Sequence, residues 1–278
     1  MEAYTGFAQV YDMFMDDVPY EAWSRYLTGL LKEYGVEEGL VLELGCGTGN
    51  MTRLLSEAGY DMIGVDNSEE MLRIAGEAAG SGDGMGKEPD ILYLLQDMRE
   101  FELYGTVKAV VSVCDSLNYI LEEEELLKVF HLVNNYLDPG GIFIFDLNTP
   151  YKYRELLGET TICENREEGS FIWENFYDEE TGLNQYDMTF FIREEDMRYR
   201  KYEETHVQRG YEAARIKELL EQAGMEFLAM FDAFTREPVR ETSERIYVIA
   251  GERGKQRFTR LQGKEKNRDL RDCKGERK

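Results

Sequence analysis

A glycine-rich stretch between an apolar run and a helical pattern has the residue types of a ligand-binding turn. It reads ELGCGTGN, from Glu43 to Asn50, with glycines at positions 45, 47 and 49. Glycine lets the backbone take positive φ angles and approach a ligand closely. Glu43 stands two residues before the first glycine, where a phosphate site would present only N–H donors. The stretch therefore favours a ligand with a cationic centre and no pyrophosphate.

Two phosphate-binding patterns do not fit this turn. A P-loop needs Gly-Lys-Ser/Thr, but the corresponding residues are Asn50, Met51 and Thr52. A dinucleotide fingerprint needs its third glycine at position 50, which is again asparagine. The next apolar run ends at Asp66, 17 residues beyond Gly49, and a carboxylate there can accept both hydroxyls of a ribose. The spacing predicts a nucleoside cofactor.

The elements that must position these residues alternate between strand and helix patterns. Strand-like apolar runs lie at 40–44, 61–65, 91–95, 107–113, 142–145, 226–234 and 245–250. Helix patterns lie at 20–34, 51–58, 122–137 and around Leu219, and Ser68 is a good N-cap for another helix. The segment 138–141, Asp-Pro-Gly-Gly, predicts a turn. This alternation predicts an α/β, Rossmann-like, doubly wound fold with a mostly parallel sheet.

The region from 158 to 209 differs in composition and predicts an antiparallel, β-rich cap. Three of its segments are rich in aromatic and β-branched residues, namely 170–177, 186–192 and 197–208. If the last segment is a strand, Glu204, His206 and Gln208 share one of its faces. We expect most aromatic residues of this cap to serve packing.

The ordered set of motifs resembles the class I S-adenosylmethionine (SAM)-dependent methyltransferases. ELGCGTGN, the strand ending in GVD and the following SEEML are similar to the first two motifs of that family. YDMFM at 11–15 and CDSLNY at 114–119 resemble a bacterial subgroup that acts on small molecules. The resemblance implies an enzyme with SAM as cofactor, which transfers the methyl group to a small-molecule acceptor by in-line displacement.

The resemblance also implies which residues hold the cofactor. Glu43 is expected near its cationic groups, Asp66 at the ribose and Asp97 at the adenine amino group. Met71 and Met98 either pack on the adenine ring or belong to the core. The expected cofactor residues are Tyr11, Glu43, Gly45, Cys46, Gly47, Asp66, Asn67, Met71, Asp97, Met98 and Cys114. Tyr11, with Tyr4 and Phe7, is expected either to form a lid or to pack on the sheet edge.

Three residues are catalytic candidates. Asp115 follows the fourth strand and is expected near the methyl group, and Tyr119 is expected to contact the acceptor. His206 either orients a polar substrate or serves only the structure of its strand, and we expect His131 to pack inside its helix. A base is optional, because an amine of lowered pKa can attack unaided.

Charge limits the range of partners. From residue 252 onward the chain has 11 basic and 5 acidic residues, about +6, whereas residues 1–251 have 21 basic and 51 acidic residues, about −30. Such an acidic body argues against a nucleic-acid partner. Two alternatives stay open: an RNA or protein methyltransferase tethered by its basic tail, and a catalytically inactive, SAM-binding regulatory protein.

We predict four parts along the chain. They are an N-terminal helical lid segment (1–35), a SAM-binding domain (36–157 and 210–251), the cap (158–209) and a basic tail (252–278). The four cysteines are scattered and only two histidines occur, so we expect no metal site. We see neither a signal peptide nor an apolar run of about 20 residues and predict a cytoplasmic protein without membrane contact. The sequence makes no prediction of oligomeric state.

Overall fold

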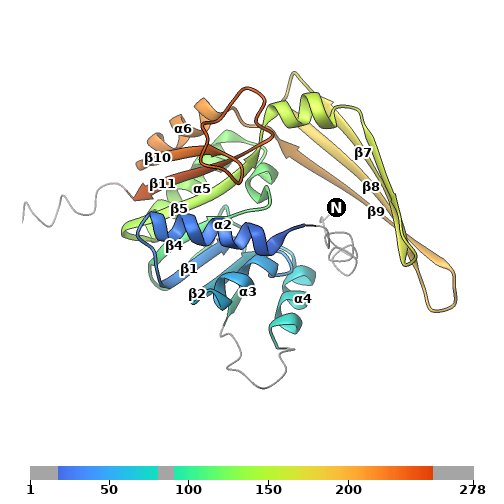
Figure 1. Cartoon of the computed structure of the whole chain (residues 1–278), viewed down its shortest axis with the longest axis horizontal. Helices are drawn as coiled ribbons and strands as arrows, with labels where there is room; N and C mark the ends of the chain where they lie inside the picture. The colour runs from blue at the N-terminus through green and yellow to red at the C-terminus, as the bar shows by residue number, and fades with distance from the viewer. Residues whose placement is uncertain (1–17, 81–90, 253–278) are drawn as a thin grey trace, which may run out of the picture.

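A computed structural model describes residues 18–80 and 91–252. These residues form a seven-stranded sheet flanked by helices and a separate four-stranded sheet (Figure 1). The larger sheet contains β1 (Gly39–Leu44), β2 (Tyr60–Asp66), β3 (Leu92–Leu95), β4 (Val107–Ser112), β5 (Leu137–Asn148), β10 (Met225–Asp232) and β11 (Arg245–Glu252). The helices are α2 (Tyr20–Glu33), α3 (Asn50–Glu57), α4 (Glu69–Ala79), α5 (Glu123–Tyr136) and α6 (Ala213–Gln222), with the short helices η1 (Ser116–Tyr119) and η2 (Lys152–Leu157).

The order of strands in the larger sheet is β10-β11-β5-β4-β1-β2-β3. The pairs from β5 to β3 are parallel, whereas β11 and β10 pair antiparallel at the other end. The winding reverses at β1, which has β2 on one side and β4 on the other. Ligands of such sheets bind at the carboxyl ends of the strands beside this reversal. The topology confirms the predicted Rossmann-like fold.

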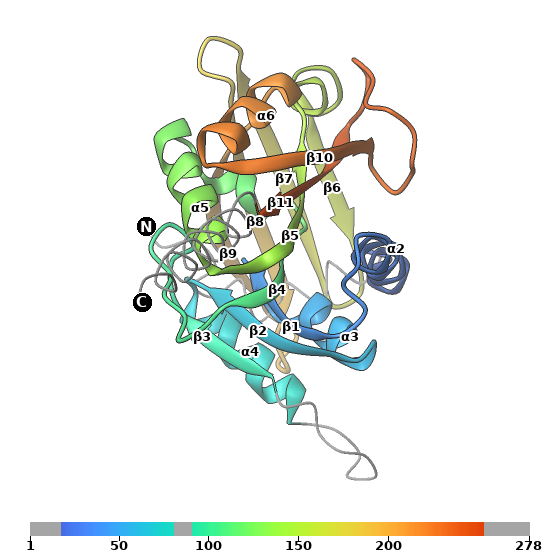
Figure 2. The same ribbon diagram turned by 90° about the vertical axis from the view of Figure 1, so that its left-hand side faces the viewer.

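Helices cover both faces of this sheet, with α2 and α3 on one side and α5 and α6 on the other (Figure 2). On α5 the buried residues Leu126, Val129, Phe130 and Val133 follow helical spacing. Burial of each such side chain contributes roughly 1.5–3 kcal/mol. The two apolar layers therefore hold the carboxyl edge of the sheet in a fixed shape.

The helix predicted after Asp66 begins as expected. Ser68 Oγ accepts a hydrogen bond from Met71 N at 3.3 Å, and Glu69 and Glu70 lie in the first turn of α4. Such a helix N-cap contributes about 1 kcal/mol to stability. It also fixes the chain directly behind Asp66.

Two local predictions were wrong. Residues 138–141 do not reverse the chain, because the ladder runs from the pair Val107–Leu137 to the pair Ala109–Ile142 and these residues bulge out of one continuous strand. Proline and glycine there mark a bend and not a hairpin. His131 is exposed on α5 and does not pack inside the helix layer.

The second sheet is the antiparallel cap, and Figure 1 shows it extending away from the larger sheet. Its strands are β6 (Thr161–Asn165), β7 (Gly169–Asp178), β8 (Leu183–Arg193) and β9 (Tyr199–Arg209). The sequence patterns missed β6, an edge strand whose side chains are almost all exposed. On β7, Phe171 is buried and Phe176 is 49% exposed, so alternation separates the two faces.

Candidate active site

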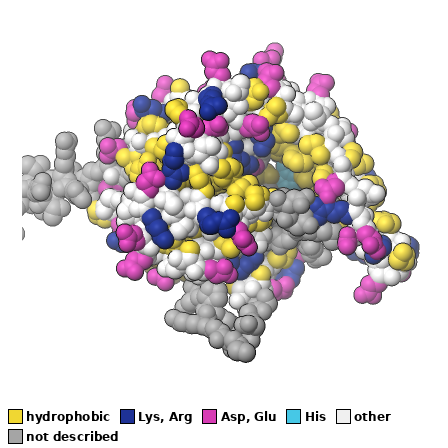
Figure 3. Space-filling view, in the orientation of Figure 1, with side chains coloured by type: hydrophobic (Ala, Val, Ile, Leu, Met, Phe, Trp, Pro, Cys, Tyr) yellow, Lys and Arg dark blue, Asp and Glu magenta, His cyan; other side chains and the backbone are white. Residues whose placement is uncertain are grey.

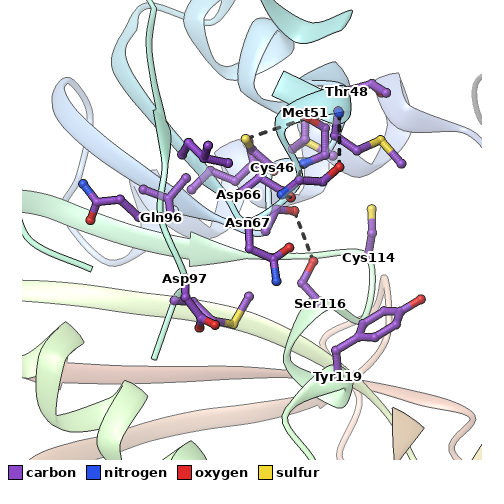
Figure 4. Close-up of a pocket in the computed structure, with 18 of the residues that line it drawn as sticks. Cys46, Thr48, Met51, Asp66, Asn67, Gln96, Asp97, Cys114, Ser116 and Tyr119 are labelled. Carbon is purple, nitrogen blue, oxygen red and sulfur yellow. Dashed lines mark hydrogen bonds between the residues drawn. The ribbon is translucent and has the colours of Figure 1, made fainter. Parts of the chain in front are cut away.

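A cavity of about 830 Å³ lies at the carboxyl ends of β1, β2 and β4. This volume is within the usual range for small-molecule sites. Predicted cofactor residues that line it are Glu43, Gly45, Cys46, Gly47, Asp66, Asn67, Met71, Asp97, Met98 and Cys114. Figure 4 shows Asp97 on one side, Ser116 and Tyr119 on the other, and Asp66 and Asn67 between them. Tyr11 and the rest of the predicted lid, Tyr4 and Phe7, lie outside the described residues.

The glycine turn is packed closely from two sides. Gly45 and Gly49 have φ angles of +72° and +75°. A Cβ atom on Gly45 would lie 2.6 Å from the Ser116 side chain, and one on Gly49 would lie 2.4 Å from Tyr93 Oη. Both positions therefore require glycine, for the backbone angle and for space.

Asp66 is fixed by the turn that it faces. Its Oδ2 accepts a hydrogen bond from Gly47 N at 2.8 Å, and its Oδ1 accepts one from Ser68 N at 2.9 Å. Burial raises the pKa of Asp66, and these two N–H donors oppose that shift. Each carboxylate oxygen has a second lone pair. The carboxylate can thus keep both backbone bonds and accept two ligand hydroxyls.

Glu43 is an acid in the interior of the protein. It is 2% exposed, and its Oε2 accepts a hydrogen bond from Thr52 Oγ1 at 2.5 Å. Burial raises the pKa of Glu43 to about 8, and the nearby Asp66 also raises it. A cation beside Glu43 would favour the ionised form.

Replacing Glu43 by glutamine is expected to stabilise the cofactor-free protein at alkaline pH. The unfolded acid ionises near its ordinary pKa of 4.5, whereas the folded one stays protonated up to about 8. Stability therefore falls as pH rises from 4.5 to 8, and the loss is complete above 8. Thermal unfolding should give wild type and Glu43→Gln similar midpoints at pH 5 and a higher midpoint for the variant at pH 9. The same difference at both pH values would contradict a buried ionisable acid.

Asp97 lines the cavity and also pairs with Arg99. Arg99 Nε lies 2.9 and 3.0 Å from the two carboxylate oxygens, and the same guanidinium contacts Glu125. Hydrogen bonds from Arg99 hold the pKa of Asp97 below its ordinary value. Asp97 is consequently a carboxylate at neutral pH and an acceptor for a ligand amino group.

The structure brings Tyr119 and His206 together, although 87 residues separate them in the chain. Tyr119 Oη lies 3.4 Å from His206 Nδ1, and Tyr119 also lines the cavity. Glu204 Oε2 lies 3.2 Å from His206 Nε2, at ion-pair distance although outside the preferred hydrogen-bond direction. The side chains of His206 and Glu204 are almost completely buried. A carboxylate, an imidazole and a phenol thus form a row that ends at the cavity.

Asp115 has different partners. Its Oδ1 lies 2.5 Å from Arg245 Nη2, and its Oδ2 accepts a hydrogen bond from Gln208 Nε2 at 2.8 Å. Cys114 and Asp115 have φ angles of +60° and +54°. Such angles cost on the order of 1–3 kcal/mol per residue. Buried Asp146 offsets this cost, because its carboxylate accepts hydrogen bonds from both backbone N–H groups.

Sequence reasoning missed two residues of this region. Ser116 Oγ donates to Gly45 O at 3.2 Å and to Val113 O at 2.9 Å, which ties η1 to the glycine turn. Its place between two candidates in CDSLNY was an available signal. Arg245 pairs with Asp115 and Asp146, but nothing in the apolar pattern of β11 indicates those partners.

The sequence predicts neither a metal site nor a membrane span, and the structure describes residues 18–80 and 91–252 in both respects. Among them, no group of three or more histidine, cysteine, aspartate and glutamate side chains is arranged to hold a metal ion. Over the same residues, no helix combines the length and apolarity that a membrane span requires.

Known proteins share this architecture and sequence. Residues 41–141 match the family model described as a methyltransferase domain. A protein named as a methyltransferase in Geobacillus sp. (strain WCH70) is 35% identical over 248 residues, which cover 89% of this chain and 98% of the relative. The chain belongs to the SAM-dependent methyltransferases. The crystal structure of one such enzyme from Clostridium acetobutylicum has a TM-score of 0.79 and 30% identity, over 90% of this chain and 99% of that one.

A more distant relative has a named substrate. The Streptomyces venezuelae enzyme named dTDP-3-amino-3,4,6-trideoxy-alpha-D-glucopyranose N,N-dimethyltransferase is 29% identical over 141 residues, which cover 50% of this chain and 56% of the relative. That name describes the methylation of an amino group.

The cavity suits SAM, the cofactor of this methyltransferase. Glu43 and Asp66 are acids of the cavity lining, as a cationic nucleoside would require, and the space beside Gly47 is open. Among the residues that the structure describes, two arginines line the cavity, and acids pair with both of them. Arg73 pairs with Glu70 and Glu77, and Arg99 pairs with Asp97 and Glu125. The lining thus has the charge that a cofactor with a sulfonium group requires.

Proposed function

We propose that this methyltransferase methylates the nitrogen of a small-molecule amine, and that Tyr119 and His206 remove the proton of that amine. The observation that carries the proposal is the double contact of Tyr119, which lines the cofactor cavity and reaches His206 at 3.4 Å. Methyl transfer itself requires little covalent chemistry from the protein. Alignment of the reactants can supply on the order of 7–11 kcal/mol in favourable cases.

The order of Tyr119, His206 and Glu204 defines the route by which a proton would leave the amine. Glu204 lies beside His206 Nε2 and favours a proton on that nitrogen, so Nδ1 is left as the acceptor. The hydroxyl of Tyr119 can donate to Nδ1 while its oxygen accepts a proton from an ammonium group in the cavity. The imidazolium then formed is stabilised by the carboxylate of Glu204. An amine that enters as a cation becomes a neutral nucleophile by this route.

The chemistry of the transfer is simple once the amine is neutral. When bound, SAM would supply an electrophilic methyl group to the nitrogen lone pair, and S-adenosylhomocysteine would leave with the electron pair of the S–C bond. Tyr119 and Ser116 belong to one short helix, and the hydrogen bond from Ser116 to Gly45 fixes that helix against the cofactor turn. Tyr119 therefore has a fixed place beside the cofactor turn, from which it would orient the nitrogen of the acceptor.

Charge and relatives support an amine acceptor. Acidic Glu204 lies buried beside His206, and the arginines of the cavity lining are paired with acids, so the site suits a cationic acceptor. The relative from Streptomyces venezuelae is named for N-methylation of an amino sugar. This likeness supports nitrogen as the attacking atom.

A panel of defined acceptors tests the proposal. Purified enzyme is incubated with SAM and each acceptor, and S-adenosylhomocysteine formation is measured by mass spectrometry. The panel contains amino sugars with and without a nucleoside diphosphate, simple amines, and the hydroxyl analogue of each. Turnover is expected with amines and not with the matched hydroxyl compounds. Turnover restricted to hydroxyl or thiol acceptors would contradict the proposal.

A further inference from the structure

We propose that Asp115 is a positioning residue that joins the cofactor side of the site to the cap. In this proposal, hydrogen bonds from Arg245 through Asp115 to Gln208 hold β9 where His206 meets Tyr119. The catalytic consequence rests on the proposed function, whereas the geometric consequence does not.

The cofactor side of this link is rigid. Asp146 is fully buried, and its Oδ1 accepts a hydrogen bond from Asp115 N at 2.8 Å. Arg245 Nη1 donates to Asp146 Oδ2 at 2.6 Å, and Nη2 of the same guanidinium lies 2.5 Å from Asp115 Oδ1. One arginine therefore fixes both acids, and the Asp115 carboxylate has a single orientation.

The cap side of this link has a fixed polarity. Gln208 is 1% exposed, and its Oε1 accepts hydrogen bonds from Tyr153 Oη at 2.8 Å and Tyr186 Oη at 2.7 Å. A phenol can donate or accept, whereas a carboxylate only accepts, so the Asp115 carboxylate assigns the end of the amide that faces it as NH₂. That NH₂ donates to Asp115 Oδ2 at 2.8 Å, and the acceptor at position 115 thereby fixes the orientation of the whole amide.

The link ends beside the proposed proton acceptor. Gln208 and His206 are two residues apart on β9 and are both buried, so they lie on the same face. Tyr186, which donates to Gln208, is also the cross-strand partner of His206. A shift of Gln208 would therefore move the buried side chains of Tyr186 and His206 relative to Tyr119.

Asn118 gives the cap a second attachment that does not use Asp115. Its Nδ2 donates to Arg209 O at 2.7 Å and to Asn148 O at 3.0 Å, and its Oδ1 accepts from Asn148 N at 3.0 Å. Loss of the Asp115 carboxylate should thus change the position of β9 without detaching the cap.

Exchange of the two partners tests the link. Asp115→Asn places an NH₂ group against one of the two donors to position 115, which are Arg245 and Gln208. Gln208→Glu places a second carboxylate against that of Asp115. In the double variant the new amide donates to the new carboxylate, which still accepts from both tyrosines. Each single variant is expected to lose about 10²-fold in kcat/KM, and the double variant to recover most of it, because small displacements in an active site cost about that factor. A double variant as impaired as Asp115→Asn would overturn the proposal, since a lost general base is not rescued at position 208.

A second readout does not depend on activity. The chain has two histidines, so nuclear magnetic resonance of the imidazoles gives two sets of signals, with exposed His131 as the internal reference. In Asp115→Asn the His206 signals should move and in the double variant return, while those of His131 stay. Unchanged His206 signals in Asp115→Asn would refute the positioning role. Absence of amine methylation, with these shifts present, would refute only the proposed function.

Discussion

Replacing His206 by glutamine is expected to lower kcat for an amine acceptor by a factor of about 10²–10⁴, the usual contribution of a positioned base. Glutamine is polar and of similar length, but it cannot accept a proton from the Tyr119 hydroxyl. Cofactor affinity should change little, because His206 is not among the residues that line the cavity. Steady-state kinetics and calorimetry with S-adenosylhomocysteine measure the two quantities separately.

The same chain provides matched controls. His131→Gln changes an exposed histidine of α5 and should leave kcat as in wild type. Tyr119→Phe removes only the hydroxyl that reaches His206 and should lower kcat about as much as His206→Gln does. Because both substitutions interrupt the same proton route, the double variant should have nearly the same kcat as either single variant. If His206→Gln keeps kcat within about threefold of wild type, the proton route through Tyr119 is wrong.

Replacing Asp66 by alanine is expected to weaken SAM binding by about 10²–10⁴-fold. The carboxylate would accept two ribose hydroxyls, and hydrogen bonds to a charged group contribute about 1.5–3 kcal/mol each. The same substitution releases Gly47 N and Ser68 N, which hold the turn and the start of α4. Both effects weaken binding of the same ligand.

Asp61 lies exposed on the same strand and provides the control for charge. Asp61→Ala should keep full affinity for S-adenosylhomocysteine in calorimetry. Full affinity in Asp66→Ala would contradict the prediction that Asp66 binds the ribose hydroxyls. Equal losses of affinity in Asp66→Ala and Asp61→Ala would indicate that net charge is the cause.

The residues expected at the cofactor could be found from the sequence, and the structure gathers ten of them at one cavity, because their signals are local. These signals lie within 24 residues of one another: the glycines of the turn, Asp66, and Ser68 at the N-cap of α4. Each has a distinct backbone requirement. Parallel topology then places the ends of β1, β2 and β4 at one edge without further information.

The acceptor half depends on contacts between distant segments. Both Asp115 and His206 are catalytic candidates in the sequence, and only the fold shows which partners each one has. Asp115 meets Arg245, 130 residues away, whereas His206 meets Tyr119. No periodicity encodes which charged side chains pair across a domain, because strand patterns report burial and not partners.

We expect the two halves of the site to have different roles in the enzyme. Residues at the ends of strands of the larger sheet line the cavity, while Glu204 and His206 come from β9 of the cap. Figure 3 shows hydrophobic side chains gathered around the hollow where the cap meets the body. We expect the choice of acceptor to follow changes in the cap, and SAM affinity to follow changes in the glycine turn.

The most direct test is to locate the transferred methyl group. The enzyme is incubated with SAM labelled in its methyl group and with a cell extract divided into small-molecule, RNA and protein fractions. We predict label in the small-molecule fraction, on a nitrogen identified by mass spectrometry, and its loss with His206→Gln. Label confined to RNA or protein, or on an oxygen or sulfur atom, would contradict the proposal.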